Sequence, residues 1–284
     1  GDCFYCGVCD KGRMKGDNRD AIGVSPKTYQ PSSLKMALDA APSAKKERLP
    51  FKVRIKFSRT GPLRFLSHLD LMTAIIRAFR RTDIPVVYSE GFAAHPKVSF
   101  GPALSVGMES ESEYLDVELG HKVGLDKVMS ELNSQFPQGI KALDAGYLTF
   151  KAESLSSAIK RFTYSLSIPV NMGYNISADA INEGMQRSEI IVTRRIEEAH
   201  KKIDIRPFIE KIELVSGVSG IQVNLILQSR DGKGCKPAEA LKGLFNINDD
   251  ELMQVMIKRT GLFILKNGKW LSPMEAMGRV VSFA

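Results

Sequence analysis

The sequence has no apolar run that approaches the roughly 18 residues a membrane-spanning helix needs. Its first residues are polar and include cysteines, which is not the pattern of a secretory signal. These two absences predict a cytoplasmic protein without a membrane anchor. Because the chain begins with Gly1 and not with methionine, we expect a processed or excised piece whose catalytic partner lies upstream.

Cysteine is scarce, with 4 residues in a chain of 284. So few thiols in so long a chain argue against a disulfide framework. Three of them form a C-x2-C-x2-C motif at Cys3, Cys6 and Cys9, and this spacing lets neighbouring thiolates converge on one ion or cluster. The motif predicts an iron–sulfur cluster or a zinc ion, and the alternative is three unligated thiols at a truncated terminus. Cys235 lies in a polar turn and is expected to be a free thiol.

The chain has fewer acidic than basic residues, with 32 Asp and Glu against 40 Lys and Arg, which gives a net charge of +8. The stretch between Phe51 and Met108 contains nine basic and three acidic residues, so about three quarters of the net charge lies in it. A local positive patch attracts a polyanion by releasing its counterions. The alternative is a solvated basic face with no partner.

Three regions of the chain differ in their residue patterns. Residues 1–50 hold the cysteine motif and a polar linker. Residues 51–150 follow the order β-α-β-β-α-β, which is the ferredoxin-like arrangement, and residues 151–284 can be interpreted in the same way. We therefore predict an α+β fold of two tandem ferredoxin-like domains with antiparallel sheets.

The periodicity places individual elements along these two domains. Expected strands cover residues 52–57, 86–89, 114–119, 140–147, 162–170, 190–194, 212–215, 221–227 and 262–265. Expected helices cover residues 67–81, 125–136, 177–187 and 237–245. Ser67, followed three residues later by Asp70, marks the start of the first helix. The apolar stripe of that helix comprises Leu69, Met72, Ile76 and Phe79.

The opposite face of the helix at 67–81 is basic. Arg77, Arg80 and Arg81 are spaced i, i+3, i+4, so they neighbour and repel one another. A helix tolerates three adjacent arginines more readily when an anion binds them. The alternative is that Asp70 and nearby acids neutralise them on a solvated face.

Two histidines and two aromatic residues occur in and after this helix. His68, in its first turn, and His95, in the following loop, could form an acid–base pair, although a histidine at the edge of the core is the simpler interpretation. In the same loop Tyr88 or Phe92 could stack on an unpaired base while Lys97 contacts a phosphate. The alternative is that these rings anchor the loop to the core.

This part of the sequence resembles the radical-SAM-linked proteins, a bacterial family encoded beside or fused behind cobalamin-binding radical SAM proteins. The resemblance rests on TGPLRFLSHLDLM at 60–72, RAFRR at 77–81, HP at 95–96, GMES at 107–110 and DVEL at 116–119, and more weakly on KIDIRP at 202–207 and KPAEA at 236–240. It covers roughly residues 51–265. It implies that the opening cysteine motif is the tail of a radical SAM portion. S-adenosylmethionine and cobalamin then belong only to the upstream or separate partner.

Family members are often encoded near ribosome-related and RNA-processing genes, so the resemblance implies RNA or a ribosomal protein as the substrate class. We predict an accessory domain that is not catalytic on its own and presents structured RNA, such as tRNA or rRNA, to a radical SAM protein. The residues expected to contact RNA are Arg64, Arg77, Arg80, Arg81, Tyr88 and Lys97, extended by Arg194, Arg195, Lys201, Lys202 and Arg206.

Two other functions fit the same patterns. Tandem ferredoxin-like units with basic helices also occur in CRISPR repeat-processing endonucleases, which makes a metal-independent RNA endonuclease using His68 and His95 the first alternative. The second is a protein-interaction scaffold for a radical SAM or ribosomal partner. The apolar segments 84–87 and 218–221 could form its surface, although core strands are their simpler interpretation.

Overall fold

The computed structural model describes residues 51–90, 92–148, 153–169, 176–196, 199–215 and 220–277. All of them belong to one compact unit, Leu49–Ala284. The motif of Cys3, Cys6 and Cys9 and the predicted linker lie outside the described residues. Within the described ranges no helix is long and apolar enough to cross a bilayer.

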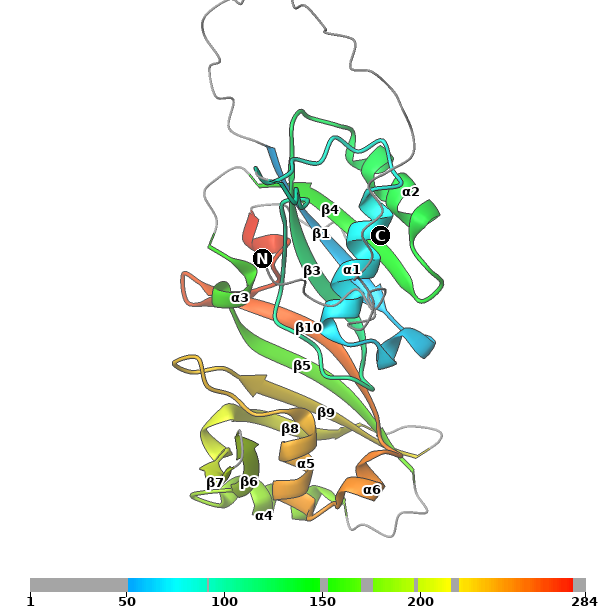
Figure 1. The fold of residues 1–284 in the computed structure, drawn as a ribbon. Helices are drawn as coiled ribbons and strands as arrows, with labels where there is room; N and C mark the ends of the chain where they lie inside the picture. The colour runs from blue at the N-terminus through cyan, green and yellow to red at the C-terminus, as the bar shows by residue number, and fades with distance from the viewer. Residues whose placement is uncertain are drawn as a thin grey trace, which may run out of the picture. The chain divides into compact units, whose positions relative to one another are not determined.

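A nine-stranded, mostly antiparallel sheet organises this unit (Figure 1). Its strands are β1 (Phe51–Arg59), β2 (Val98–Phe100), β3 (Glu109–Leu119), β4 (Ile140–Tyr147), β5 (Ile159–Ile168), β8 (Ile209–Val215), β9 (Ile221–Gln228), β10 (Met256–Lys266) and β11 (Lys269–Leu271). They follow the order β4-β1-β3-β10-β5-β9-β8, with β2 paired to β3 and β11 paired to β10. A separate hairpin is formed by β6 (Ile191–Ile196) and β7 (Ala199–Asp204).

The helices lie over two parts of this sheet. They are α1 (His68–Phe79), α2 (Leu125–Gln135), α3 (Leu155–Ala158), α4 (Ala178–Gln186), α5 (Pro237–Phe245) and α6 (Asp249–Leu252). Short 3₁₀ helices occur at Gly61–Phe65, Arg206–Phe208 and Glu275–Met277. In Figure 1, α1 and α2 lie over β1, β3 and β4, whereas α4 and α5 lie over β8 and β9.

The first half has its own core. Val53, Ile55 and Phe57 alternate along β1 and are almost completely buried, because every second residue of a strand points to the same face. They pack in one cluster with Ile75 of α1 and Leu132 of α2. β1 pairs antiparallel with both β3 and β4, so it is the centre of this half.

The second half repeats the arrangement around β5. This strand pairs antiparallel with β9 and β10, and β8 pairs with the other side of β9. Leu166, Val223 and Leu225 of the sheet pack with Leu241 and Leu244 of α5 in a second core. The β6–β7 hairpin is inserted between α4 and β8.

The predicted α+β class is confirmed. In each half four strands run in the order fourth, first, third, second, once the inserted hairpin is set aside. Two tandem ferredoxin-like domains, divided between residues 150 and 151, stay a prediction, because the two halves share one continuous sheet. The strand predicted at 86–89 forms only isolated bridges, Val86 to Leu119 and Tyr88 to Pro96.

The stripe predicted for α1 is wrong in its rotation about the helix axis. Leu71, Ile75, Ala78 and Phe79 are buried, whereas Leu69 is 72% exposed. The helix has apolar residues on more than one arc, and periodicity alone does not say which arc faces the sheet. The helix starts where predicted. The Ser67 Oγ accepts a hydrogen bond from the backbone N–H of Asp70 at 3.1 Å, and the Ser67 hydroxyl donates to the Asp70 carboxylate at 2.6 Å.

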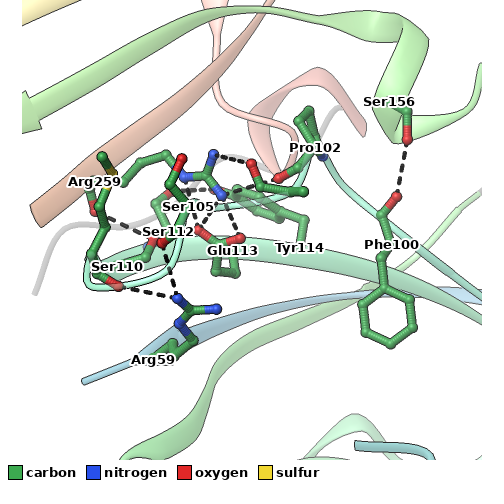
Figure 2. Close-up of polar contacts among 12 residues, drawn as sticks. Arg59, Phe100, Pro102, Ser105, Ser110, Ser112, Glu113, Tyr114, Ser156 and Arg259 are labelled. Carbon is green, nitrogen blue, oxygen red and sulfur yellow. Dashed lines mark hydrogen bonds and ion pairs between the residues drawn. The ribbon is translucent and has the colours of Figure 1, made fainter. Parts of the chain in front are cut away.

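The two halves join where β10 meets β3. The two strands pair in parallel through only two residue pairs, Lys258 with Glu109 and Arg259 with Ser110. Beside this short pairing the guanidinium of Arg259 donates to the carboxylate of Glu113, with Nε–Oε1 at 2.8 Å and Nη2–Oε1 at 2.6 Å (Figure 2). Both side chains are buried.

The charge of Arg259 is maintained despite its burial. Burial lowers the pKa of Arg259, but the carboxylate of Glu113 and the hydroxyl of Tyr164 outweigh this effect, and the pKa is raised overall. The Arg259 Nη2 also donates to the Pro102 carbonyl at 3.1 Å. The ion pair therefore cross-links β10, β3 and the segment that precedes β3.

We predict that Glu113→Gln lowers the free energy of unfolding by about 3 kcal/mol, because it leaves the guanidinium of Arg259 buried without a counter-charge. Urea denaturation followed by circular dichroism measures the change. Glu111→Gln is the matched control, since Glu111 pairs with Lys258 on the same two strands but is exposed, and we expect a loss below about 1 kcal/mol. Equal losses in the two variants would contradict a special role for the buried pair.

Candidate functional site

The solvent face of α1 carries two arginines without a partner. Asp70, Arg77 and Arg80 are exposed there, and the Asp70 carboxylate is occupied at the start of the helix. In the part of the chain that the structure describes, no hydrogen bond or ion pair reaches the side chain of Arg77 or Arg80. Arg81 differs, because its Nε and Nη2 donate to the side-chain and backbone oxygens of Gln135 at 3.0 and 2.7 Å.

The loop of residues 82–97 connects α1 to β2 and is anchored to β3 through its backbone. The Val87 N–H donates to the carbonyl of Glu118 at 2.8 Å, and the Lys97 N–H donates to the carbonyl of Val87 at 2.8 Å. Tyr88 is 42% exposed and Phe92 is fully exposed. The Lys97 Nζ lies 3.7 Å from the Glu118 carboxylate. The bonds to β3 thus fix the two ends of the loop, next to Tyr88 and at Lys97.

His68 and His95 lie in different environments. His68 is half-buried and meets Phe100 edge-on, with ring centroids 6.1 Å apart. His95 is exposed, and its backbone N–H donates to the Ser89 hydroxyl at 3.0 Å. Among the described residues neither imidazole has a hydrogen bond to a carboxylate or hydroxyl that could orient it. General acid–base catalysis by these residues therefore stays a hypothesis.

A groove of about 900 Å³ lies between the Gly61–Phe65 turn and residues 106–109 on one side and α6 and the start of β10 on the other. Its walls are apolar, and several of their side chains are strongly exposed: Phe65 61%, Val106 58%, Met253 79% and Met256 53%. Ser165, Ser167 and Gln222 of β5 and β9 contribute polar groups to its lining. This groove was not predicted from the sequence.

The charges at the rim of the groove are paired within the chain. The Arg64 Nη1 lies 3.7 Å from the Glu109 carboxylate, and the guanidinium of Arg64 covers the ring of Phe65 at 4.8 Å. The Lys258 Nζ donates to the Glu111 carboxylate at 2.8 Å. Arg64 therefore belongs to the groove and is partly neutralised there.

Arg59 lies fully buried behind this groove. Its Nη2 donates to the backbone carbonyls of Arg64, Ser105 and Met108 at 2.9, 3.3 and 3.3 Å. No partner within the described ranges reaches its Nε or Nη1, and burial lowers its pKa. The alternation of β1 could have revealed this residue, because Arg59 falls on the inward side with Val53 and Phe57.

The second predicted basic cluster lies on and just after the separate β6–β7 hairpin, in the other half of the unit from Arg77 and Arg80. Arg194 binds both carboxylate oxygens of Glu239 at 2.8 and 2.7 Å. Arg206 donates to the backbone carbonyls of Met185 and Ile209 at 2.7 and 3.1 Å. Both guanidiniums thus hold the fold together. Arg195, Lys201 and Lys202 lie on the hairpin strands.

Metal ligands are not grouped in the described part of the chain, where no set of three or more His, Cys, Asp or Glu side chains could hold an ion. The predicted ligands Cys3, Cys6 and Cys9 lie outside it. Cys235 is different, because burial and the nearby charge of Glu239 raise its pKa to about 12.

Comparison with known proteins gives a family and a weak structural likeness. The family model described as "Uncharacterized protein conserved in bacteria (DUF2344)" matches residues 52–237. No curated protein matches the sequence.

Two solved structures are similar over part of their length. "Crystal Structure of a Cbf5-Nop10-Gar1 Complex" is 10% identical with a TM-score of 0.34, over 74% of this chain and 48% of that one. "Crystal structure of the archaeal box H/ACA sRNP Nop10-Cbf5 complex" is 10% identical with a TM-score of 0.32, over 73% and 46%. The chain spans about half the length of these structures, and likeness at this level assigns no function.

We predict that the Cys235 thiol is unreactive in the folded protein. Its raised pKa leaves little thiolate at pH 8, so alkylation should be slower than in the unfolded chain by on the order of a hundredfold or more. Iodoacetamide labelling of a variant with Cys3, Cys6 and Cys9 replaced by serine, with and without urea, measures this ratio. Labelling at equal rates in both states would contradict the raised pKa of this half-buried thiol.

Proposed function

We propose that this chain, which belongs to the family of uncharacterized proteins conserved in bacteria (DUF2344), is an accessory domain that binds structured RNA for a radical SAM partner. The observation that carries the proposal is the pair of exposed arginines on α1, Arg77 and Arg80, to which no described residue is bound. A guanidinium is well suited to bidentate contact with a phosphate.

The position of these arginines favours an anion as their ligand. They are three residues apart on one helix, and like charges at this spacing destabilise a helix by a few tenths of a kcal/mol, roughly 0.2–0.5. Asp70, the acid on the same exposed face, is seven residues away from Arg77, and its carboxylate accepts a hydrogen bond from the Ser67 hydroxyl. Binding a phosphate relieves the repulsion and releases counterions from the RNA.

The neighbouring loop favours RNA with unpaired bases. Tyr88 and Phe92 are both exposed, and Tyr88 follows directly on Val87, whose backbone is bonded to β3, so little ordering of the backbone is needed when a base stacks on Tyr88. Sequence-specific RNA recognition relies on such stacking in loops and bulges. A folded RNA offers both elements, a duplex with its phosphates and unpaired bases beside it.

The assignment of a radical SAM partner is supported by the sequence resemblance at residues 60–72 and by the motif of Cys3, Cys6 and Cys9. The three thiolates suit an iron–sulfur cluster or zinc. S-adenosylmethionine and cobalamin would be bound by the partner, which supplies the radical chemistry. This chain would supply affinity for the RNA and its orientation.

We predict that Arg77→Ala/Arg80→Ala removes most RNA affinity. Wild-type affinity should fall steeply with salt, and the double variant should reduce the slope of log K against log salt by about 1 to 2 units, because two phosphate contacts are lost. Fluorescence anisotropy with a tRNA or rRNA hairpin at several salt concentrations measures both quantities.

The matched control is Lys141→Ala/Lys269→Ala, which removes two exposed charges from strands β4 and β11. It should bind RNA as the wild type does. Undetectable or salt-independent binding by the wild type, or an equal loss in the control, would refute RNA binding through α1.

A protein-interaction scaffold is a second candidate function, favoured by the apolar groove. Its exposed walls, Phe65, Val106, Met253 and Met256, with paired charges at the rim, suit an uncharged apolar segment of a protein. Methionine side chains adapt to such partners.

For this function we predict that a purified radical SAM protein of the associated kind is retained by the chain after nuclease treatment and at high salt. Met253→Lys should abolish retention, because it places a charge on the apolar wall. Leu143→Lys, an exposed position on β4, is the control and should retain the partner. Retention lost with nuclease would instead indicate that RNA bridges the two proteins.

A further inference from the structure

The β6–β7 hairpin aligns basic residues across its two strands. The register pairs Arg194 with Lys201, Arg195 with His200, and Thr193 with Lys202. From this arrangement we infer that the outer face of the hairpin, carrying His200 and Lys202, is a second surface that contacts RNA phosphates. The inference rests on the proposed RNA function and assigns the contact to a different part of the fold from α1.

The two faces of the hairpin are distinguished by burial. Val192 is 8% exposed and belongs to the second core, and its cross-strand partner Ile203 packs against the same core. Residues alternate between faces along a strand, so Arg194 shares this inner face with Val192. His200 and Lys202 fall on the opposite face, and both are exposed.

The inner face fixes the hairpin on α5. A Cβ atom on Gly243 would lie 2.4 Å from the Ile190 Cγ2 and 3.3 Å from the Val192 Cγ1, so only glycine allows this close packing. Arg194 adds its bidentate contact with Glu239 of α5. These contacts fix the inner face of the described hairpin strands on α5.

The base of the hairpin is fixed as well. The Asp204 carboxylate accepts the backbone N–H groups of Ile190 and Arg206 at 2.8 and 3.0 Å. A surface that is held in place in this way binds with little loss of conformational entropy.

The charge on the outer face fits a row of phosphates. Lys202 and His200 recur at every second residue of β7, opposite Thr193 and Arg195 of β6. The acids of this region are Asp204, whose carboxylate binds backbone N–H groups, and Glu197 and Glu198 in the connection, outside the described residues.

The structure divides the basic cluster that the sequence suggested. Arg194 and Arg206 are positioning residues, because their guanidiniums are engaged by Glu239 and by backbone carbonyls. His200, which the sequence did not single out, joins Lys202 on the exposed side. The residues inferred to contact RNA are therefore His200 and Lys202, and not Arg194 or Arg206.

The test compares His200→Ala/Lys202→Ala with His200→Arg/Lys202→Arg. Anisotropy with the same RNA hairpin, at pH 7 and several salt concentrations, should show a roughly 5- to 10-fold loss of affinity and a smaller salt slope for the alanine variant. The arginine variant should bind at least as tightly as the wild type, because both of its arginines carry positive charge on the outer face. Lys141→Ala, which removes one exposed lysine charge from β4, controls for net charge.

The outcomes separate this inference from the proposed function. Wild-type affinity in the alanine variant, together with loss in Arg77→Ala/Arg80→Ala, would overturn the hairpin surface and leave RNA binding through α1 intact. No binding by the wild type would overturn both. If both surfaces contact RNA, the combined variant should lose the product of the two separate fold-changes, since the sites are far apart and independent.

Discussion

The ion pair of Arg259 and Glu113 controls how the two half-sheets become one. β3 and β10 share only two residue pairs, which is little backbone hydrogen bonding for a junction in the middle of a sheet. The buried guanidinium compensates by contacting Glu113 on β3 and the carbonyl of Pro102 before it. A buried pair of this kind adds little stability compared with an apolar contact, but it strongly penalises any arrangement that separates its members. Its main contribution is therefore to specify the junction.

The same junction explains why the groove has firm walls. Arg59 places a second guanidinium near Arg259. The negative charge of Glu113 raises the pKa of Arg59, and the positive charge of Arg259 lowers it. Three backbone carbonyls stabilise the cation in the low-dielectric interior, including those of Arg64 and Met108. These bonds fix the turns that carry Phe65 and Val106. The exposure of Phe65 and Val106 thus follows from an ordered backbone. Exposed apolar side chains cost free energy in water, and a group of them is typical of a binding site.

Sequence periodicity predicted the elements whose two faces differ clearly. α5 and β4 have the predicted bounds, because caps and alternation mark their ends. β7 was missed since AHKKID is almost entirely polar, and β10 was predicted only at 262–265 because Lys258 and Arg259 interrupt its apolar pattern. Both strands depend on partners distant in the chain. The groove is likewise formed by segments almost 200 residues apart, so no local pattern could reveal it.

The roles of the arginines show most clearly what composition leaves undetermined. Arg54 and Arg59 contributed to the basic excess of residues 51–108, but both are buried, and Arg54 is neutralised by Asp116 at 2.8 and 2.9 Å. They add little to the field outside the molecule. The surface charge available to a polyanion therefore comes from fewer residues, above all Arg77 and Arg80. Binding that depends on so few cations must be sensitive to each of them, which distinguishes a defined phosphate site from the diffuse attraction of a generally basic protein.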